Sequence, residues 1–492
     1  MSGIRQVDRR GSSTPVRGGD RVGAGRLAVM GVAGAIGLSV VLAACNPAAS
    51  RPEAGSTGSS TAASGSSTGP FTKQPNGSLR ISGFNPSDEV GKSRSDYAAS
   101  QSAGVKVSQD TTNFDPQKFT AQVASGNVPD LIQADRAIIA TLADKKLVMP
   151  LDQCYSVWGV KPTEQYYPAA INDLTYQGKV YGIPQFFQAS IIIGNDTVLG
   201  QHGLKVSDLD TSDPEGLVKA AATMTKKQGN KLTTEGFEGD IPGSAALWLK
   251  VFGGGMYDKD GKPTLDTPEN EKALTFMKQL SDAQGGYATI KSFKDAQDVF
   301  GDNNAYVANQ VGAQVWAQWY VNVLTNTKDK VKISGQVIKD NQGKPLGFAG
   351  GSAFAIPSKA KNPSAACAWA VNATSTKAWD AAAQARLQTV KEKKGLFTGL
   401  FTGSPVADQQ IRSAYVKPTG NAGFDQTIET TYAALENTVS TGSSPVGQQA
   451  SNALSNAVQS ALTGSASPSA ALKQAQSTAM EAWAQSAAGK GK

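Results

Sequence analysis

The chain has 492 residues and a formal net charge of +7. Residues 1–44 contain six Arg and two Asp, which leaves only +3 of the +7 for the rest of the chain. So small a net charge, with no Lys/Arg cluster interleaved with aromatic residues, argues against nucleic-acid binding. The 448 residues that follow residue 44 are enough for two or three domains with cores of their own.

The N-terminal segment, residues 1–44, predicts export. Several arginines precede an apolar run at 27–41 that carries no charge, and small residues follow it. The quartet Leu-Ala-Ala-Cys ending at Cys45 resembles the lipobox of bacterial lipoproteins. That resemblance implies cleavage before Cys45, lipid on its sulfur and anchoring to the cell membrane, facing outside the cytoplasm. The alternative is an uncut transmembrane helix, for which the apolar run is barely long enough.

A linker is expected at residues 45–77. Ser, Gly, Thr, Ala and Pro dominate this segment, and apolar residues are almost absent from it. Because such a composition cannot offset its ordering entropy, we predict a flexible spacer between the anchor and the folded body.

Beyond the linker, strand-like and helix-like patterns follow one another. Short apolar runs predict strands at 79–84, 105–107, 128–132, 185–193 and 347–356. Helical periodicity or capping chemistry predicts helices at 115–123, 136–142, 214–227, 244–252, 268–283, 363–372, 376–388, 450–462 and 469–488. Strands that alternate with helices indicate an α/β fold with a parallel sheet.

Four motifs then carry a resemblance to a known family. They are Ser-Gly-Asn-Val-Pro-Asp at 125–130, Tyr-Gln-Gly-Lys-Val-Tyr-Gly-Ile-Pro at 176–184, the Gly-Gly and Asp-Thr-Pro-Glu pair within 254–269, and Gly-Gly followed by Asn-Pro-Ser-Ala-Ala within 350–366. Together they resemble the extracellular solute-binding proteins of ABC importers, the type that includes maltose-binding protein. The resemblance runs from about residue 78 to the C-terminus.

This resemblance implies a two-lobe, periplasmic-binding-protein-like fold (type II) whose lobes are joined by crossing hinge strands. Lobe one would hold 78–185 and 353–410, and lobe two would hold 186–352 and 411–492. The implied function is capture of an extracellular solute, a mono- or oligosaccharide, in the cleft between the lobes. The implied partners are that small-molecule solute and the transmembrane subunits of an ABC permease. We expect a monomer with no cofactor and no bound metal.

Candidate ligand-binding residues follow from the chemistry of a sugar, which needs aromatic platforms for its C–H faces and planar polar groups for its hydroxyls. Strand ends and crossing segments supply Phe84, Asn85, Gln133, Asp135, Phe187, Gln188, Trp248, Trp316, Trp319, Gly351 and Ser352. Each aromatic could instead pack in a core, and for Phe187 and its neighbour Phe186 site and core are weighed about equally. Asp135 could instead cap the helix that follows it.

One departure from the family pattern concerns the ligand. The segment 448–462 resembles the part of maltose-binding protein that supplies further stacking aromatics, but residues 454–458 here read Leu-Ser-Asn-Ala-Val. A shorter or differently shaped sugar is therefore expected in place of a long maltodextrin.

Two cysteines remain if Cys45 carries lipid. An even pair in an oxidising compartment suggests a disulfide, although Cys154 and Cys367 could also be separate buried thiols. The resemblance places both in lobe one, which favours the bond.

Enzymatic signals are weak. The chain has a single histidine, His202, and no serine lies in a nucleophile motif that this histidine could activate. No pair of His and Cys residues has the spacing of a metal site. A two-carboxylate glycoside hydrolase and a binder of a polyamine, peptide or phosphodiester remain the alternatives to a sugar-binding protein.

Overall fold

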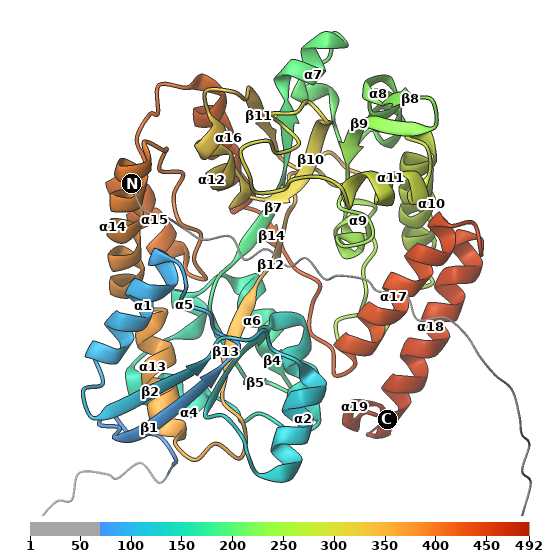
Figure 1. Ribbon diagram of the computed structural model, residues 1–492. Helices are drawn as coiled ribbons and strands as arrows, with labels where there is room; N and C mark the ends of the chain where they lie inside the picture. The colour runs from blue at the N-terminus through green and yellow to red at the C-terminus, as the bar shows by residue number, and fades with distance from the viewer. Residues whose placement is uncertain (1–68, 492) are drawn as a thin grey trace, which may run out of the picture. The chain divides into compact units, whose positions relative to one another are not determined.

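The computed structural model describes residues 69–491, and the expected signal peptide, Cys45 and most of the expected linker lie outside that range. The described chain forms two main β-sheets, each covered by helices (Figure 1). We call each sheet with its helices a lobe. In Figure 1 the first lobe, with β1, β2 and β13, lies in the lower part of the view, and the second lobe, with β7, β9 and β10, lies in the upper part.

The sheet of the first lobe combines parallel strands with one returning strand. Its strand order is β2 (Val105–Asp110), β1 (Gly77–Ser82), β3 (Leu131–Asp135), β13 (Ser352–Ala355) and β6 (Ile183–Pro184). The first three strands are parallel, as expected, whereas β13 runs antiparallel to β3 and β6. The difference arises because β13 re-enters this lobe from the second one.

Helices cover both faces of this sheet, because alternate residues of each strand point to opposite sides. Leu131 packs with α4 and α13, and its neighbour Ile132 packs with α2 and α3. The helices of this lobe are α1 (Glu89–Ser100), α2 (Pro116–Ser125), η1 (Arg136–Ile138), α3 (Ile139–Asp144), α4 (Asp152–Trp158), α5 (Pro162–Gln165), α6 (Pro168–Leu174), α13 (Pro363–Ala373), α14 (Thr376–Lys393) and α15 (Pro405–Tyr415), with a hairpin of β4 (Thr175–Tyr176) and β5 (Lys179–Val180).

Local sequence explains where these helices begin and end. Asp115 accepts hydrogen bonds from the backbone amides of the first turn of α2, and Pro116 follows at the first helical position. Gly126, with φ of 76°, ends the helix in the left-handed conformation that glycine favours.

The sheet of the second lobe is mixed. Its order is β14 (Thr438–Val439), β12 (Gly347–Gly350), β7 (Gln188–Asn195), β10 (Val311–Ala317), β9 (Lys231–Glu238) and β8 (Lys226–Gln228), with β11 (Ile333–Gln336) also paired to β7. The helices are α7 (Asp196–Gln201), η2 (Val206–Asp208), α8 (Pro214–Met224), α9 (Ala245–Val251), α10 (Pro268–Ala283), α11 (Tyr287–Lys294), α12 (Tyr320–Leu324), η3 (Thr325–Thr327), α16 (Ala422–Ala434), α17 (Gly447–Leu462), α18 (Pro468–Gln485) and α19 (Ala487–Lys490).

Three segments carry the chain between the lobes. The first lies between β6 and β7, the second is the junction of β12 with β13, and the third joins α15 to α16 (Figure 1). The segment from β14 to α17, which we call the β14–α17 segment, begins and ends in the second lobe and contacts the first lobe through Ser440 and Ser443. The strand expected over 347–356 is therefore two strands in two sheets, separated by Gly351. The expected boundary at residue 410 falls inside α15, whose residues Ala407 and Ile411 pack against α14.

Two further features stabilise the first lobe. Cys154 of α4 and Cys367 of α13 form a disulfide with Cα atoms 5.9 Å apart, which confirms the expected pair. Residues 69–76 were expected to belong to the linker, yet Phe71 is buried in the core of this lobe. The Thr72 amide also donates to Ser364 Oγ at 2.9 Å. The single aromatic residue overrides the polar composition around it, because burying its ring stabilises the fold.

Candidate functional site

A cleft runs between the lobes along the crossing segments. It consists of three adjoining hollows of about 490, 520 and 420 Å³. The middle hollow shares Gln133 and Gln188 with one neighbour and Asp135 and Gly351 with the other. The carboxyl ends of β1 and β3 open into the cleft, which is where open α/β sheets bind ligands.

The hollow of about 490 Å³, which we call the aromatic hollow, is lined by rings from both lobes. Phe84 follows β1, Phe186 lies in the first crossing segment, and Trp319 follows β10 of the second lobe. Amide side chains lie between these rings: Asn85, Asn113, Gln133, Gln185, Gln188 and Asn322. Apolar faces next to amide groups are the surroundings that a sugar ring requires.

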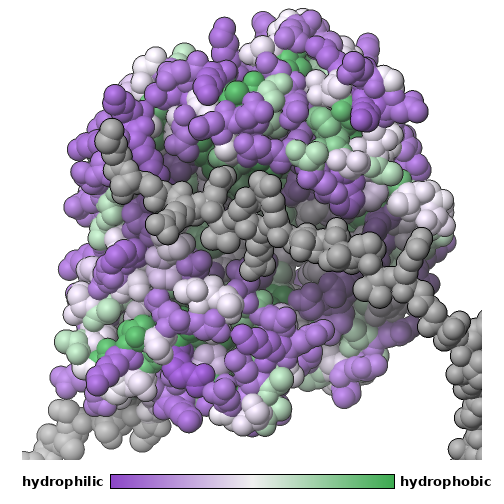
Figure 2. Space-filling view, viewed as in Figure 1, coloured by the Kyte–Doolittle hydropathy of each residue, from purple (hydrophilic) through white to green (hydrophobic). Residues whose placement is uncertain are grey.

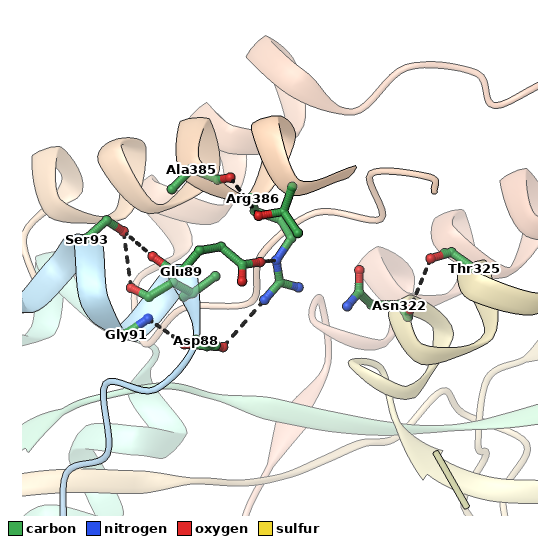
Figure 3. A network of polar contacts seen from close by, with 10 residues as sticks. Asp88, Glu89, Gly91, Ser93, Asn322, Thr325, Ala385 and Arg386 are labelled. Carbon is green, nitrogen blue, oxygen red and sulfur yellow. Dashed lines mark hydrogen bonds and ion pairs between the residues drawn. The ribbon is translucent and has the colours of Figure 1, made fainter. Parts of the chain in front are cut away.

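Charged groups close one end of the aromatic hollow. Arg386 of α14 forms ion pairs with Glu89 and with Asp88, the latter at 3.5 Å from Nη2 to Oδ2. Figure 3 shows the Arg386 guanidinium directed toward these carboxylates, and Asn322 of α12 across from it with its amide facing the same space. Arg94 lies deeper, stacked 3.7 Å from the ring centre of Trp379, and burial lowers the pKa of Arg94 to about 9.

The hollow of about 420 Å³, which we call the serine hollow, is different in character. Hydroxyl groups line it: Ser244, Thr441, Ser451 and Ser455. The carboxylates of Asp135 and Asp173 also reach it. Asp135 accepts a hydrogen bond from the Ala137 amide at 2.9 Å, and burial raises the pKa of Asp173 although Arg136 next to it opposes the shift.

The outer surface offers little apolar area by comparison. Among residues 69–491, the exposed large hydrophobic side chains are Phe300 and Val406. Figure 2 shows a face that is mostly hydrophilic, with small separate hydrophobic patches.

Residues 69–491 contain neither a membrane-spanning helix nor a cluster of metal-ligating side chains. No helix within 69–491 combines the length and the hydropathy needed to cross a membrane. Over the same residues, no three His, Cys, Asp or Glu side chains come together in a way that could hold a metal ion.

Comparison with known proteins identifies the family. Residues 93–389 match the family described as bacterial extracellular solute-binding protein. This chain belongs to that family. The two-lobe architecture agrees with it: the mannobiose-bound protein CpMnBP1 superimposes with a TM-score of 0.66 at 22% identity, covering 83% of this chain and 100% of the other. At that identity the match shows the fold.

Two relatives match over shorter segments. An arabinooligosaccharide-binding protein of Halalkalibacterium halodurans is 26% identical over 24% of this chain and 25% of its own length. A probable ABC transporter-binding protein of Deinococcus radiodurans is 23% identical over 40% of this chain and 48% of its own length. The chain thus spans between a quarter and a half of the length of these relatives.

Most of the solute-site residues expected from the sequence lie together in the cleft. Those that line it are Phe84, Asn85, Gln133, Asp135, Gln188, Trp319, Gly351 and Ser352. Asp135 lines the cleft and also caps η1, which confirms the capping interpretation; a role in solute binding stays a prediction.

Three expected residues do not line any of these hollows. Trp248 is fully buried and donates from Nε1 to the Gly239 carbonyl at 2.9 Å. Phe187 is fully buried and stacks on Tyr167 at 4.6 Å, whereas Phe186 next to it lines the cleft. The Trp316 ring stacks on the Tyr320 ring with centroids 4.5 Å apart, and it packs against the core of the second lobe together with Trp319.

Sequence reasoning missed several cleft residues. Trp379 and Arg386 are seven positions apart on α14, a spacing that places both on one helix face and could have drawn attention to them. Ser244 and Ser451 carried no comparable signal, because isolated serines are common at the surface.

Proposed function

We propose that this protein is the substrate-binding lipoprotein of an ABC importer and that it captures a short carbohydrate in the cleft. One observation supports this most strongly: the aromatic hollow combines the accessible rings of Phe186 and Trp319 with interleaved amide side chains. The Phe84 ring, which also lines it, is only 3% exposed and packs edge-on against Phe354 and Trp369. Rings bind the apolar faces of a sugar, and amides can both donate to and accept from its hydroxyls.

The length of the ligand follows from the opposite end of the cleft. Leu454 and Ser455 of α17 line the serine hollow, where a longer stack of sugar rings would need aromatic platforms. Stacking is thus confined to one end, and hydroxyl groups serve the other. A ligand of one to three sugar units suits this arrangement.

The relatives support the carbohydrate class. One is named for arabinooligosaccharides, and CpMnBP1 holds mannobiose. Relative and neighbour differ in sugar, so they support the class of ligand and leave its identity open to experiment.

The N-terminal sequence supports a membrane tether. With lipid on Cys45, the protein would face outward on the cell membrane, and the segment up to residue 68 would connect the lipid anchor to the lobes. A tether raises the effective concentration of the receptor near the transmembrane subunits of its permease. No second copy is needed for the cleft, so we propose a monomer.

A glycoside hydrolase is the enzymatic alternative, and the serine hollow does present two carboxylates. Each already has a structural partner: Asp135 caps η1, and Asp173 pairs with Arg136 at 3.2 Å. Hydrolysis needs one carboxyl group free to donate a proton and one free to attack or activate water. Binding without hydrolysis is therefore the function that we propose.

Thermal unfolding with a ligand panel tests the proposal. The panel contains mannobiose, arabinotriose and spermidine, each also recovered afterwards and analysed by chromatography. A bound sugar at 100 times its Kd should stabilise the fold by about 2.7 kcal/mol and be recovered unchanged. Recovery of cleaved sugar would refute binding without catalysis, and stabilisation by spermidine alone would refute the carbohydrate class.

The anchor is tested separately by Cys45→Ala in the full chain expressed in a bacterium that processes lipoproteins. The unaltered protein should partition into detergent with the membrane fraction, and the variant should not. Equal partitioning of both would exclude Cys45 as the lipid site. A Thr57→Ala variant, which leaves the quartet intact, is the matched control.

A further inference from the structure

One buried arginine contacts two of the three segments that cross between the lobes. Arg136 follows β3 and is 1% exposed. Its Nη1 donates to the Phe186 carbonyl of the first crossing segment at 2.9 Å, and its Nη2 donates to the Ala349 carbonyl of the second at 3.2 Å. A guanidinium can donate to both carbonyls at once because its N–H groups diverge within a fixed plane.

The β14–α17 segment of the second lobe is held through Asp173, which is 3% exposed. Asp173 Oδ2 accepts from Arg136 Nε at 3.2 Å, and its Oδ1 accepts from the Ser440 hydroxyl at 2.5 Å. Ser440 directly follows β14, at the start of the segment that leads into α17. The Arg136–Asp173 pair therefore connects two crossing segments and the β14–α17 segment through side chains.

The approach of these segments is close enough to require glycine. Gly351, at the junction of β12 and β13, has φ of +145°. A Cβ there would lie 2.4 Å from the Phe186 carbonyl oxygen and 2.5 Å from Arg136 Nη1. The Arg136 amide also donates to the Gly351 carbonyl at 3.1 Å. Neighbouring atoms thus leave no room for a side chain at the point where the segments meet.

We propose that Arg136 and Asp173 form a clasp that holds two crossing segments and the β14–α17 segment at one point and sets the balance between open and closed lobes. Arg136, Asp173 and Gly351 also line the serine hollow, so a solute in the cleft lies directly against the clasp. A buried ion pair contributes little net stability but can favour one arrangement over others. The link from clasp to solute capture rests on the proposed function, whereas the mechanical part does not.

Ser440→Ala is the most informative variant, because Ser440 does not line any of the three hollows and its loss removes one hydrogen bond. Ser443→Ala is the matched control: Ser443 lies in the same segment, but its hydroxyl donates to the Thr175 carbonyl, away from the clasp. Arg136→Lys tests the other member of the clasp, because a lysine keeps the positive charge but lacks the several diverging N–H donors of a guanidinium.

Backbone amide exchange of the full-length, solute-free protein gives the readout. In Ser440→Ala we expect amides of the segments 183–189 and 346–352, as well as 437–442, to exchange about fivefold faster, the ratio that loss of one ordinary hydrogen bond produces. Ser443→Ala should change exchange only near residue 443. Arg136→Lys should act on 437–442, to which its side chain connects only through Asp173.

Changes restricted to the substituted segment in Ser440→Ala would overturn the clasp, even if Arg136→Lys does not fold. Titration with mannobiose then tests the link to capture: Ser440→Ala should change its affinity about fivefold without touching the sugar. Unchanged affinity together with faster exchange would overturn that link. If the unaltered protein binds no sugar, the proposed function fails while the exchange result stands by itself.

Discussion

The ring of Phe300 lies nearly parallel to that of Trp319, with centroids 6.1 Å apart and planes 18° from parallel. Trp316 and Tyr320 meet Trp319 edge-on at 5.6 and 5.8 Å. The indole of Trp319 is thereby oriented by neighbouring rings while it lines the aromatic hollow. A platform that is already oriented loses little conformational entropy when a sugar binds.

Replacing this platform should weaken sugar binding and leave the fold intact. For Trp319→Ala we expect mannobiose affinity to fall by about 1–3 kcal/mol, because a stacking surface is lost. Titration calorimetry measures the affinity and circular dichroism checks the fold. Trp158→Ala is the matched control, since Trp158 is half-buried on α4 and lines none of the hollows. Equal losses in both variants would assign Trp319 a structural role alone.

Trp248 should behave in the opposite way. It is fully buried among Phe237 and Phe276, at ring distances of 6.3 and 5.0 Å. Trp248→Ala should therefore lower the free energy of unfolding by about 3–5 kcal/mol through the cavity that it leaves. Urea titration measures this loss. A stability equal to that of the unaltered protein, with weaker sugar binding, would contradict the core assignment.

The disulfide joins residues 213 positions apart in the sequence, so it restricts a long loop of the unfolded chain. The double variant Cys154→Ala with Cys367→Ala should lose about 2–5 kcal/mol of unfolding free energy. Thiol titration of the unreduced, secreted protein should find neither cysteine free. Labelling of either one by a thiol reagent before reduction would exclude the bond.

Asp408 should make stability depend on pH. It accepts hydrogen bonds from the Tyr167 hydroxyl and the Thr402 amide, both at 2.7 Å, and burial raises its pKa to about 7. Because the folded pKa exceeds the unfolded value near 3.8, folding favours the protonated form between these pH values. Its contribution is fully present below about pH 4 and is lost as the pH rises through about 7.

Asp408→Asn should remove that dependence. Between pH 5 and pH 8, the difference in unfolding free energy between variant and unaltered protein should shift in favour of the variant, by about 2–3 kcal/mol at most. Urea titrations at four pH values measure this difference in unfolding free energy. Because the other buried acids titrate in both proteins, their contributions cancel in the difference. A difference that stays constant with pH would show that Asp408 does not titrate in this range.

Much of the fold could be predicted from local sequence. The helix at 268–283 and the start of the helix at Pro116 lie where capping residues and periodicity place them. The predicted strand over 347–356 failed at Gly351, because nothing in a run of small and apolar residues reveals that the chain changes sheets there. Phe71 was likewise hidden in a polar segment, since a composition average does not register one buried ring.

The candidate site was predictable in kind and less so in detail. Strand ends and crossing segments supplied Gln133, Gln188 and Trp319, because topology brings such positions to one edge of a sheet. Phe186 and Phe187 are adjacent, and which of them faces the cleft depends on the pleat of the crossing segment and on Tyr167, which covers Phe187.

The sequence by itself determined the family and the alternation of strands and helices, and it predicted the export signal and the mixture of rings and amides that suits a sugar. Those properties depend on neighbouring residues or on short motifs. Only the tertiary structure decided which tryptophan lines the cleft, that Arg386 meets Glu89, and that Arg136 and Asp173 join two crossing segments to the β14–α17 segment. Such contacts join residues up to hundreds of positions apart, and they depend on how whole elements pack, which no local preference encodes.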